Sequence, residues 1–226
     1  KRYLLDEQDI PTQWYNIQAD MPVKPLPPLH PVTHKPMKAE DLAEIFSMEC
    51  SRQELDTEHA WIDIPEEVLD MYPYYRSTPL VRPYALEKAL DTPAHIYFKN
   101  ESVNPLGSHK VNSALPQCYY CKQEGVTNVT TETGAGQWGA ALSYAAKVFG
   151  LEAAVYQVKI SMQQKPYRSL IMRAFGAMVE GSPSMSTRAG KDIVTRDPMH
   201  PGSLGTAISE AIELARTTPR CKYTLG

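Results

Sequence analysis

A lysine stands where a helix is expected to begin. Residues 104–108 contain a proline and a glycine that interrupt regular structure, and Ser108 suits a helix N-cap, so Lys110 falls in the first helical turn. Acidic residues are preferred there because the helix dipole is positive at its N-terminus, and a lysine is unfavourable. A helix terminus together with burial favours the neutral amine, which is a nucleophile toward a carbonyl. The position of Lys110 therefore indicates carbonyl chemistry.

A glycine-rich turn follows from Glu132 to Gly139, with the sequence Glu-Thr-Gly-Ala-Gly-Gln-Trp-Gly. Its backbone N–H groups can bind an anion at a helix N-terminus. The spacing of Gly134, Gly136 and Gly139 matches the dinucleotide fingerprint, but no acidic residue follows a second strand about 20 residues on. Glu132 would also repel the phosphates of a dinucleotide. The turn fits a smaller anion, such as a carboxylate, beside a general acid or base; glycines needed only for tight helix–sheet packing are the alternative.

The other reactive side chains form no recognisable site. Cys118 and Cys121 have C-x-x-C spacing, but no second pair and no active-site helix start accompany them. Two buried cysteines are expected, rather than redox or zinc chemistry. The histidines are scattered without metal-ligand spacing, so no metal is expected. The basic run Lys165 to Arg168 is expected to be the solvated start of a helix.

The composition is that of an ordinary globular protein. The 226 residues are 42% hydrophobic and 22% charged, which is enough for one large domain or two small ones. A net charge of −3 and a pI near 6.1 argue against binding to nucleic acid or to an anionic membrane. The sequence shows neither a membrane-spanning apolar run nor a signal peptide. Four scattered cysteines make no disulfide framework, so we expect a reduced, cytoplasmic protein.

Strands alternate with helices of about a dozen residues from residue 96 onward. We expect strands at 96–99, 126–131, 153–158, 177–180 and 222–225, and helices at 111–124, 137–149, 163–175, 187–195 and 204–216. Such alternation is typical of β-α-β units and a parallel sheet, whose ligands bind at the carboxyl ends of the strands. Because Lys110 and the turn at Glu132 each follow an expected strand, we predict that both open on the same edge of that sheet.

The first part of the chain is rich in proline. Prolines within residues 1–38 block helices and sheet ladders, so an extended arm is expected, anchored by Trp14 and Tyr15. Short helices are expected at 36–51, 64–69 and 86–90. The predicted division is a proline-rich arm (1–38), a helical and loop segment (39–95), a domain with the lysine and the glycine turn (96–202), and the start of a C-terminal domain (203–226). An open sheet edge at Gly226 and an N-terminal residue other than methionine lead us to expect part of a longer chain.

Two long motifs resemble a known family. The runs Asn104 to Asn112 and Glu132 to Gly139, in that order, resemble the β chain of tryptophan synthase. The proline-rich arm, the tryptophan within the glycine turn and the run Gln164 to Arg168 resemble its second, β-like type. The resemblance covers essentially the whole chain. It implies a pyridoxal-phosphate enzyme of fold type II, an α/β protein with three-layer parallel sheets and flanking helices, here lacking its C-terminal part.

The resemblance also implies roles for particular residues. Lys110 would form a Schiff base with pyridoxal 5′-phosphate and then remove the Cα proton of L-serine. Glu132 would assist departure of the serine hydroxyl and orient the indole that replaces it, giving L-tryptophan. The other residues that would line the cofactor are His109, Asn112 and Gln137. The residues that would bind the substrate carboxylate are Thr133, Gly134, Ala135, Gly136, Gln137 and Trp138.

Several alternatives stay open. The substrate is L-serine or O-phosphoserine. A serine or threonine ammonia-lyase of the same fold is the rival enzyme, although such enzymes typically lack a glutamate at the start of the substrate loop. An inactive fragment that acts as a binding module is the rival of another class. The resemblance implies a homodimer, while the altered N-terminal arm argues against the usual α-type partner.

Three departures from the family bear on these roles. Ser77 stands where the family usually has proline, and Leu106 stands where threonine is common. The phosphate cup and the partner of the pyridine nitrogen would lie beyond Gly226. A chain of these residues alone is therefore expected to hold the cofactor poorly.

Overall fold

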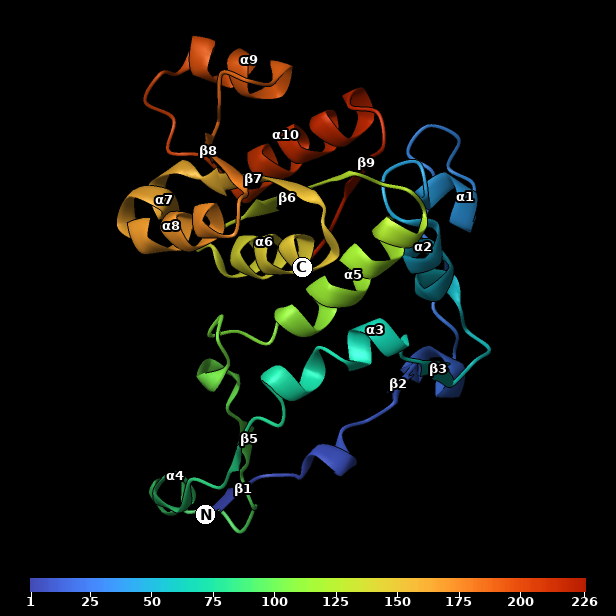
Figure 1. Cartoon of the computed structure of the whole chain (residues 1–226), viewed down its shortest axis with the longest axis vertical. Coiled ribbons are helices and arrows are strands. Elements are labelled where there is room, and N and C mark those ends of the chain that lie inside the picture. The colour runs from blue at the N-terminus through green and yellow to red at the C-terminus, as the bar shows by residue number, and fades with distance from the viewer. The chain divides into compact units, whose positions relative to one another are not determined.

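The backbone divides into two units that each contain two stretches of sequence. The computed structural model describes residues 1–226 (Figure 1). One unit comprises Lys1–Tyr15 and Trp61–His109, and the other comprises Asn16–Ala60 and Lys110–Gly226. The four-part division expected from the sequence stays a prediction, and the two units have boundaries different from it.

A four-stranded parallel sheet forms the centre of the second unit. Its order is β8-β7-β6-β9, with β6 at Asn128–Thr133, β7 at Glu152–Val158, β8 at Met178–Ser182 and β9 at Cys221–Tyr223. Every neighbouring pair runs parallel. This confirms the predicted α/β class and four of the five expected strands. β9, the last strand in the sequence, pairs with β6, the first of the sheet.

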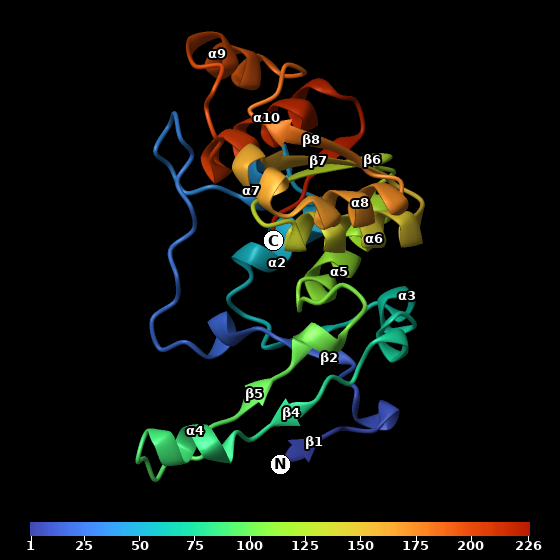
Figure 2. The same ribbon diagram turned by 90° about the vertical axis from the view of Figure 1, so that its left-hand side faces the viewer.

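Helices cover both faces of this sheet (Figures 1 and 2). One face carries α6 (Gln137–Phe149) and α8 (Pro166–Ala174), with α5 (Val111–Gln123) packed on α6; the other carries α10 (Leu204–Thr217). The buried face of α10 is lined by Ala207 and Ala211, whose small side chains let the helix approach Tyr156 and Tyr223 of the sheet. The layers therefore follow from alanine-rich helix faces packed on a sheet that is buried on both sides.

Helix ends in this unit largely match expectation. α6 spans the residues predicted for it, and the helix that follows Lys110 ends as expected at Gly125, whose φ of 75° is readily adopted only by glycine. The single helix expected at 163–175 is wrong. It is two helices, α7 (Lys159–Gln164) and α8, because Lys165 precedes Pro166 and a residue before proline is driven out of the helical region. The remaining helix, α9, is at Arg188–Arg196.

The first unit contains two small antiparallel sheets. One has the order β1-β4-β5, formed by Arg2–Tyr3, Leu80–Val81 and Phe98–Lys99; the other pairs β2 (Gln13–Tyr15) with β3 (Trp61–Asp63). Short helices are α3 (Glu66–Leu69) and α4 (Tyr84–Ala89), and 3-10 turns are η1 (Glu7–Asp9), η3 (Tyr72–Tyr74) and η4 (Glu101–Val103).

The strand predicted at 96–99 is therefore not part of the parallel sheet. It shrinks to β5, which pairs antiparallel with β4. The prediction that Lys110 follows a strand of the same sheet as Glu132 is wrong. β-propensity identified the strand, but a strand's partner is decided by tertiary packing, which the local sequence does not contain.

The proline-rich arm is less extended than expected. It contains β1, η1, β2 and a further 3-10 turn, η2 (Ile17–Asp20). The two predicted anchors are confirmed for the first unit, because Trp14 and Tyr15 lie in β2 opposite Ile62 and Trp61, and the Tyr15 and Trp61 rings are 5.0 Å apart. None of the helices of the chain is both long and apolar enough to cross a membrane.

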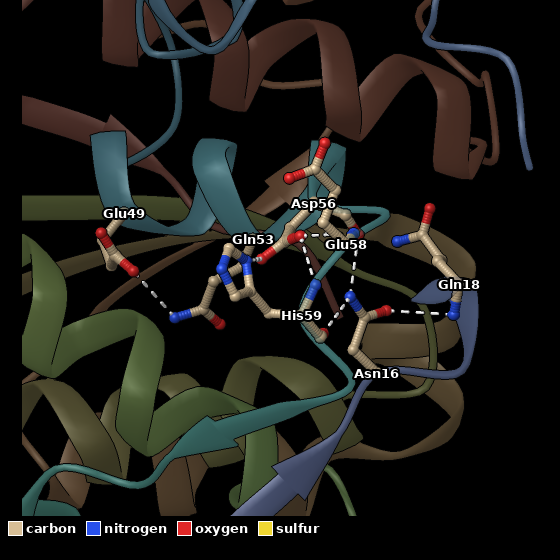
Figure 3. A network of polar contacts seen from close by, with 7 residues as sticks. All are labelled: Asn16, Gln18, Glu49, Gln53, Asp56, Glu58 and His59. Carbon is tan, nitrogen blue, oxygen red and sulfur yellow. Dashed lines mark hydrogen bonds and ion pairs between the residues drawn. The ribbon is translucent and has the colours of Figure 1, made fainter. Parts of the chain in front are cut away.

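The next part of the arm is fastened within the second unit by polar contacts. The Asn16 side chain donates to the carbonyl oxygens of Asp56 (2.8 Å) and His59 (3.1 Å), and its own oxygen accepts from Gln18 N–H (Figure 3). The Asp56 carboxylate in turn accepts from the Glu58 and His59 N–H groups. The helix expected at 36–51 is in fact two, α1 (Ala39–Leu42) and α2 (Met48–Leu55).

Candidate active site

Glu132 lies inside strand β6 rather than in the loop after it. Its side chain is 5% exposed, and its Oε2 accepts a hydrogen bond from the Tyr223 hydroxyl on the neighbouring strand β9. Burial raises the pKa of Glu132, while the hydrogen bond from Tyr223 and the positive charge of Lys110 act in the opposite direction. A carboxyl with a raised pKa can act as a general acid as well as a base.

Successive residues of β6 serve opposite faces of the sheet. Glu132 shares a face with Tyr223 and with Tyr156, its register partner on β7, and both tyrosines pack in the core cluster with α10. Thr131 and Thr133 lie on the α6 face, because they bond Trp138 and Gly139 of that helix. The end of β6 therefore presents a carboxylate on one face and supports the glycine turn from the other.

Thr131 connects the start of α6 to the segment after β9. Its Oγ1 accepts from Trp138 Nε1 at 2.6 Å and donates to the Thr224 carbonyl at 2.7 Å. The Thr224 N–H donates in turn to the Thr130 carbonyl at 2.9 Å. These bonds hold residues 224–226 along the end of β6, with Gly226 against the Trp138 ring.

Two glycines of the turn are required for different structural reasons. Gly136 has a φ of 96°, and a Cβ there would lie 2.6 Å from Arg168 Cβ. At Gly139 a Cβ would lie 2.5 Å from Met172 Sδ, so this glycine permits close packing of α6 on α8. Beside Gly134 the space is open to 4 Å. Tight packing therefore explains Gly139, and the turn itself keeps room beside its backbone.

The backbone of the turn is fixed from behind by side chains. The Gly139 N–H donates to Thr133 Oγ1 at 3.2 Å, and Gln157 Nε2 approaches the Gly134 carbonyl at 3.5 Å. Gln157 is itself held by Ser169, whose hydroxyl donates to its Oε1 at 2.8 Å. The first N–H groups of a helix have no acceptor within it, so the start of α6 can bind an anion such as a carboxylate.

Lys110 is the N-cap residue of α5 and belongs to the second unit, as Glu132 does. The expected cap, Ser108, is wrong, because the helix starts two residues later; the Ser108 carbonyl instead accepts from Asn104 Nδ2 at 2.7 Å. Lys110 is half-buried, and its charge is the weakest of the influences that lower the pKa of Glu132. The joint role of the two residues in one site stays a prediction.

The other expected site residues are spread over both units. Asn112 is half-buried in the first turn of α5, and Gln137 is the exposed first residue of α6. His109 is exposed and belongs to the first unit. The cofactor-lining roles of all three stay predictions, as does the carboxylate-binding role of residues 133–138.

The buried state expected for Cys118 and Cys121 is confirmed. Burial raises the pKa of both thiols, so they remain protonated and unreactive. No group of three histidine, cysteine, aspartate or glutamate side chains is arranged to hold a metal ion.

Four residues of this site were missed from the sequence: Thr131, Gln157, Tyr223 and Thr224. Local patterns carried no signal for Tyr223, since its contact with Glu132 depends on β9 lying beside β6. Gln157 offered a weak signal, as a polar residue near the end of an apolar strand.

The chain combines a glycine turn between a strand and a helix, a buried glutamate at the end of that strand, and a lysine at the start of another helix. These features indicate the class of enzyme that a comparison with known families identifies. Residues 71–224 match the model of the family described as pyridoxal-phosphate dependent enzyme, and the chain belongs to that family. The fold is accordingly the α/β fold type II of these enzymes.

Individual relatives indicate a narrower group within this family. The chain is 53% identical to tryptophan synthase beta chain 2 of Thermotoga maritima, with 98% of this chain and 52% of that protein covered. It is 51% identical to tryptophan synthase beta chain 2 of Aquifex aeolicus and 49% identical to that of Methanosarcina mazei, covering all of this chain and 52% and 51% of those proteins. The chain spans about half the length of the curated relatives it matches.

One solved structure shows a weaker similarity. A fungal L-serine ammonia-lyase from Rhizomucor miehei aligns with a TM-score of 0.48 at 20% identity, covering 67% of this chain and 40% of that one. A match at this level supports no functional conclusion.

Proposed function

We propose that this chain carries the lysine and glutamate of a tryptophan synthase β-type site, which joins L-serine to indole by β-replacement. The observation that carries the proposal is the buried Glu132, on whose pKa the charge of Lys110 acts, at the end of a strand that leads into the glycine turn. The relatives named tryptophan synthase beta chain 2 support the choice of reaction.

The residues present fit the reactive part of pyridoxal phosphate. The half-buried Lys110 supplies an amine for its aldehyde, and the space beside Gly134 and the N–H groups at the start of α6 suit the carboxylate of an amino acid bonded next to it. When bound, the cofactor supplies an electron sink for a carbanion at the substrate Cα.

The proton transfers fall to Lys110 and Glu132. Once the amine of serine has displaced it from the cofactor, Lys110 Nζ accepts the Cα proton of serine. The serine Cβ–O bond then breaks with its electron pair going to oxygen, and the Glu132 carboxyl gives that oxygen a proton, so that water leaves. The resulting carboxylate accepts a hydrogen bond from the indole N–H while C3 of indole forms the new bond to Cβ. C3 then loses its proton, and Lys110 returns its proton to Cα, which gives L-tryptophan. The raised pKa of Glu132 suits the first of its two tasks.

Other parts of the proposal depend on the relatives more than on this chain. O-phosphoserine is a second substrate, for which the leaving phosphate needs less help from an acid. A homodimer is proposed, without the usual α-type partner, because of the altered arm. No observation on this chain favours an ammonia-lyase, and Glu132 in the site argues against one.

The test uses the full-length protein and its Lys110→Ala variant. Mixed with pyridoxal phosphate, the unchanged protein should develop the visible band of cofactor bonded to a lysine amine and form tryptophan from indole and serine. Lys110→Ala should lose both, whereas Lys122→Ala, on the exposed far end of the same helix, should keep both. Cofactor bonded as well in Lys110→Ala as in the unchanged protein would show that another lysine is used. Ammonia release from serine at the same rate without indole would favour the lyase.

A further inference from the structure

We infer that Tyr223 is a positioning residue for Glu132: its hydroxyl occupies Oε2, so that Oε1 is the oxygen left to meet the substrate. The inference rests on the function proposed above. Glu132 and Tyr223 are 5% and 3% exposed, on neighbouring strands, and the tyrosine hydroxyl donates to the carboxylate. A carboxylate with one oxygen fixed has a defined direction for its remaining lone pairs.

Thr131 does not compete for this role. Its Oγ1 lies 3.5 Å from Glu132 Oε2, which is long for a bond between oxygens, but 2.7 Å from the Thr224 carbonyl. A hydroxyl has one proton, and the shorter contact takes it. Thr131 Oγ1 also accepts a hydrogen bond from Trp138 Nε1. The Tyr223 hydroxyl is therefore the donor that orients Glu132.

Tyr223 is itself held on several sides. Its backbone N–H donates to the Ile45 carbonyl at 2.8 Å, and its Cα is in register with Thr130 of β6. The Phe46 ring lies 5.6 Å from the Tyr223 ring, and Ala207 and Ala211 of α10 complete the enclosure. A ring packed on all these sides cannot swing away from the carboxylate without disturbing the core.

The protonation states agree with a donor role. Burial, together with the adjacent Glu132, raises the pKa of Tyr223 far above its usual range, so its hydroxyl keeps its proton throughout the working pH range. The titratable groups facing Glu132 are Tyr223, Lys110 and, across β7, Tyr156, whose pKa is also raised by burial. Removing the Tyr223 hydroxyl should therefore raise the pKa of Glu132 further.

The matched pair of variants is Tyr223→Phe and Tyr156→Phe. Each removes one buried hydroxyl from the same face of the sheet, but that of Tyr223 donates to Glu132, whereas Glu132 is not among the groups that shift the pKa of Tyr156. The Glu132 carboxyl is titrated by infrared difference spectroscopy, with Glu132→Gln identifying its band. Tyr223→Phe should move this titration to higher pH, and Tyr156→Phe should leave it in place. In the holoenzyme, Tyr223→Phe should lower kcat for tryptophan formation about 10- to 100-fold, with little change in the KM for serine, as expected for loss of one hydrogen bond to a charged group.

The outcomes separate this inference from the function on which it rests. An unshifted Glu132 titration in Tyr223→Phe, or an equal shift in Tyr156→Phe, overturns the positioning role whatever the enzyme does. A shifted titration in a full-length protein that makes no tryptophan leaves the pair standing as a structural fact and overturns both the proposed reaction and the role of the pair in it. A shifted titration with unchanged kcat shows that Tyr223 sets the pKa of Glu132 but not its catalytic direction, which also overturns the inference.

Discussion

The ends of strands β6 and β8 each involve a buried glutamate, and the two glutamates are held in opposite ways. Glu210 of α10 is fully buried, and its Oε1 accepts from the Ser184 N–H (2.9 Å), the Ser184 hydroxyl (2.6 Å) and the Thr187 hydroxyl (2.7 Å). All three donors belong to the turn between β8 and α9. Glu132 instead has one hydroxyl on Oε2 and a lysine charge nearby.

The difference lies in the partners, since burial is similar. The donors to Glu210 are a backbone group and short side chains of one turn, all of them on Oε1, and a Cβ on Gly190 would collide with that oxygen; the buried Oε2 has no hydrogen-bond partner. Such a carboxylate stabilises a turn. Glu132 has a single strong donor and a pKa raised by burial, so it retains the capacity to exchange a proton. An incompletely occupied carboxylate therefore does not by itself mark a reactive glutamate, because Glu210 also has an oxygen without a donor; Glu132 differs by its raised pKa and by the lysine charge that acts on it.

The largest expected effect is on catalysis at Glu132. Glu132→Ala should lower the kcat of the full-length enzyme about 10²- to 10⁴-fold, because a general acid is lost, while cofactor binding at Lys110 is kept. Steady-state tryptophan formation and a cofactor titration measure the two quantities. Glu210→Ala, assayed per folded molecule, should retain most of its activity. If the two variants lose kcat equally, the two glutamates do not differ in the way described.

The next effect is on stability at Glu210. Glu210→Ala leaves three buried donors without an acceptor, and we expect a loss of about 3 kcal/mol or more in the free energy of unfolding. Denaturant unfolding measures it. The control is Glu213→Ala, which removes the less buried acceptor of the Arg188 and Ala189 N–H groups and should cost about 1 kcal/mol. Equal losses in the two variants would mean that the turn does not depend on Glu210.

The smallest effect is the pH dependence of stability at Glu132. Because its pKa is raised in the folded state, the unfolded chain releases this proton first, and folding loses stability as pH rises from the unfolded pKa through the folded one. Glu132→Gln removes that loss. The variant should therefore gain stability relative to the unchanged protein between acid and neutral pH, as followed by thermal unfolding at several pH values. A difference that stays constant with pH would show that Glu132 is not held with a raised pKa.

The local sequence predicted the parts of the site that lie on neighbouring elements. The alanine-rich stretch after Gly136 gave the helix α6 with its correct bounds, and the turn residues correctly placed a helix start after β6, while anion binding there stays a prediction. The glycine pattern left two interpretations open, and the structure divides them, with Gly139 used for packing and Gly134 beside open space.

The long-range partners could not be predicted. Period and propensity identified a strand near Phe98, but the strand joined an antiparallel sheet with β4, since pairing is decided by tertiary packing. Tyr223 was assigned to the start of a further domain, because the sequence does not say that β9 returns to β6. The break at Lys165 was locally readable from the proline that follows it, and the periodicity of the flanking residues concealed it.

The placement of β9 beside β6 also has a consequence for how the chain assembles. The two residues of the Glu132–Tyr223 pair are 91 positions apart, and β7, β8 and five helices intervene. The ribosome makes β6 before β9. The edge of β6 that will pair with β9 therefore stays unpaired, with Glu132 solvated and ionised, until the intervening residues have been synthesised and folded. Closing so long a loop is slow, so we expect the burial that raises the pKa of Glu132 to be among the last events of folding. A nascent or prematurely ended chain that lacks residues 221–223 would have the glutamate without the environment that sets its pKa.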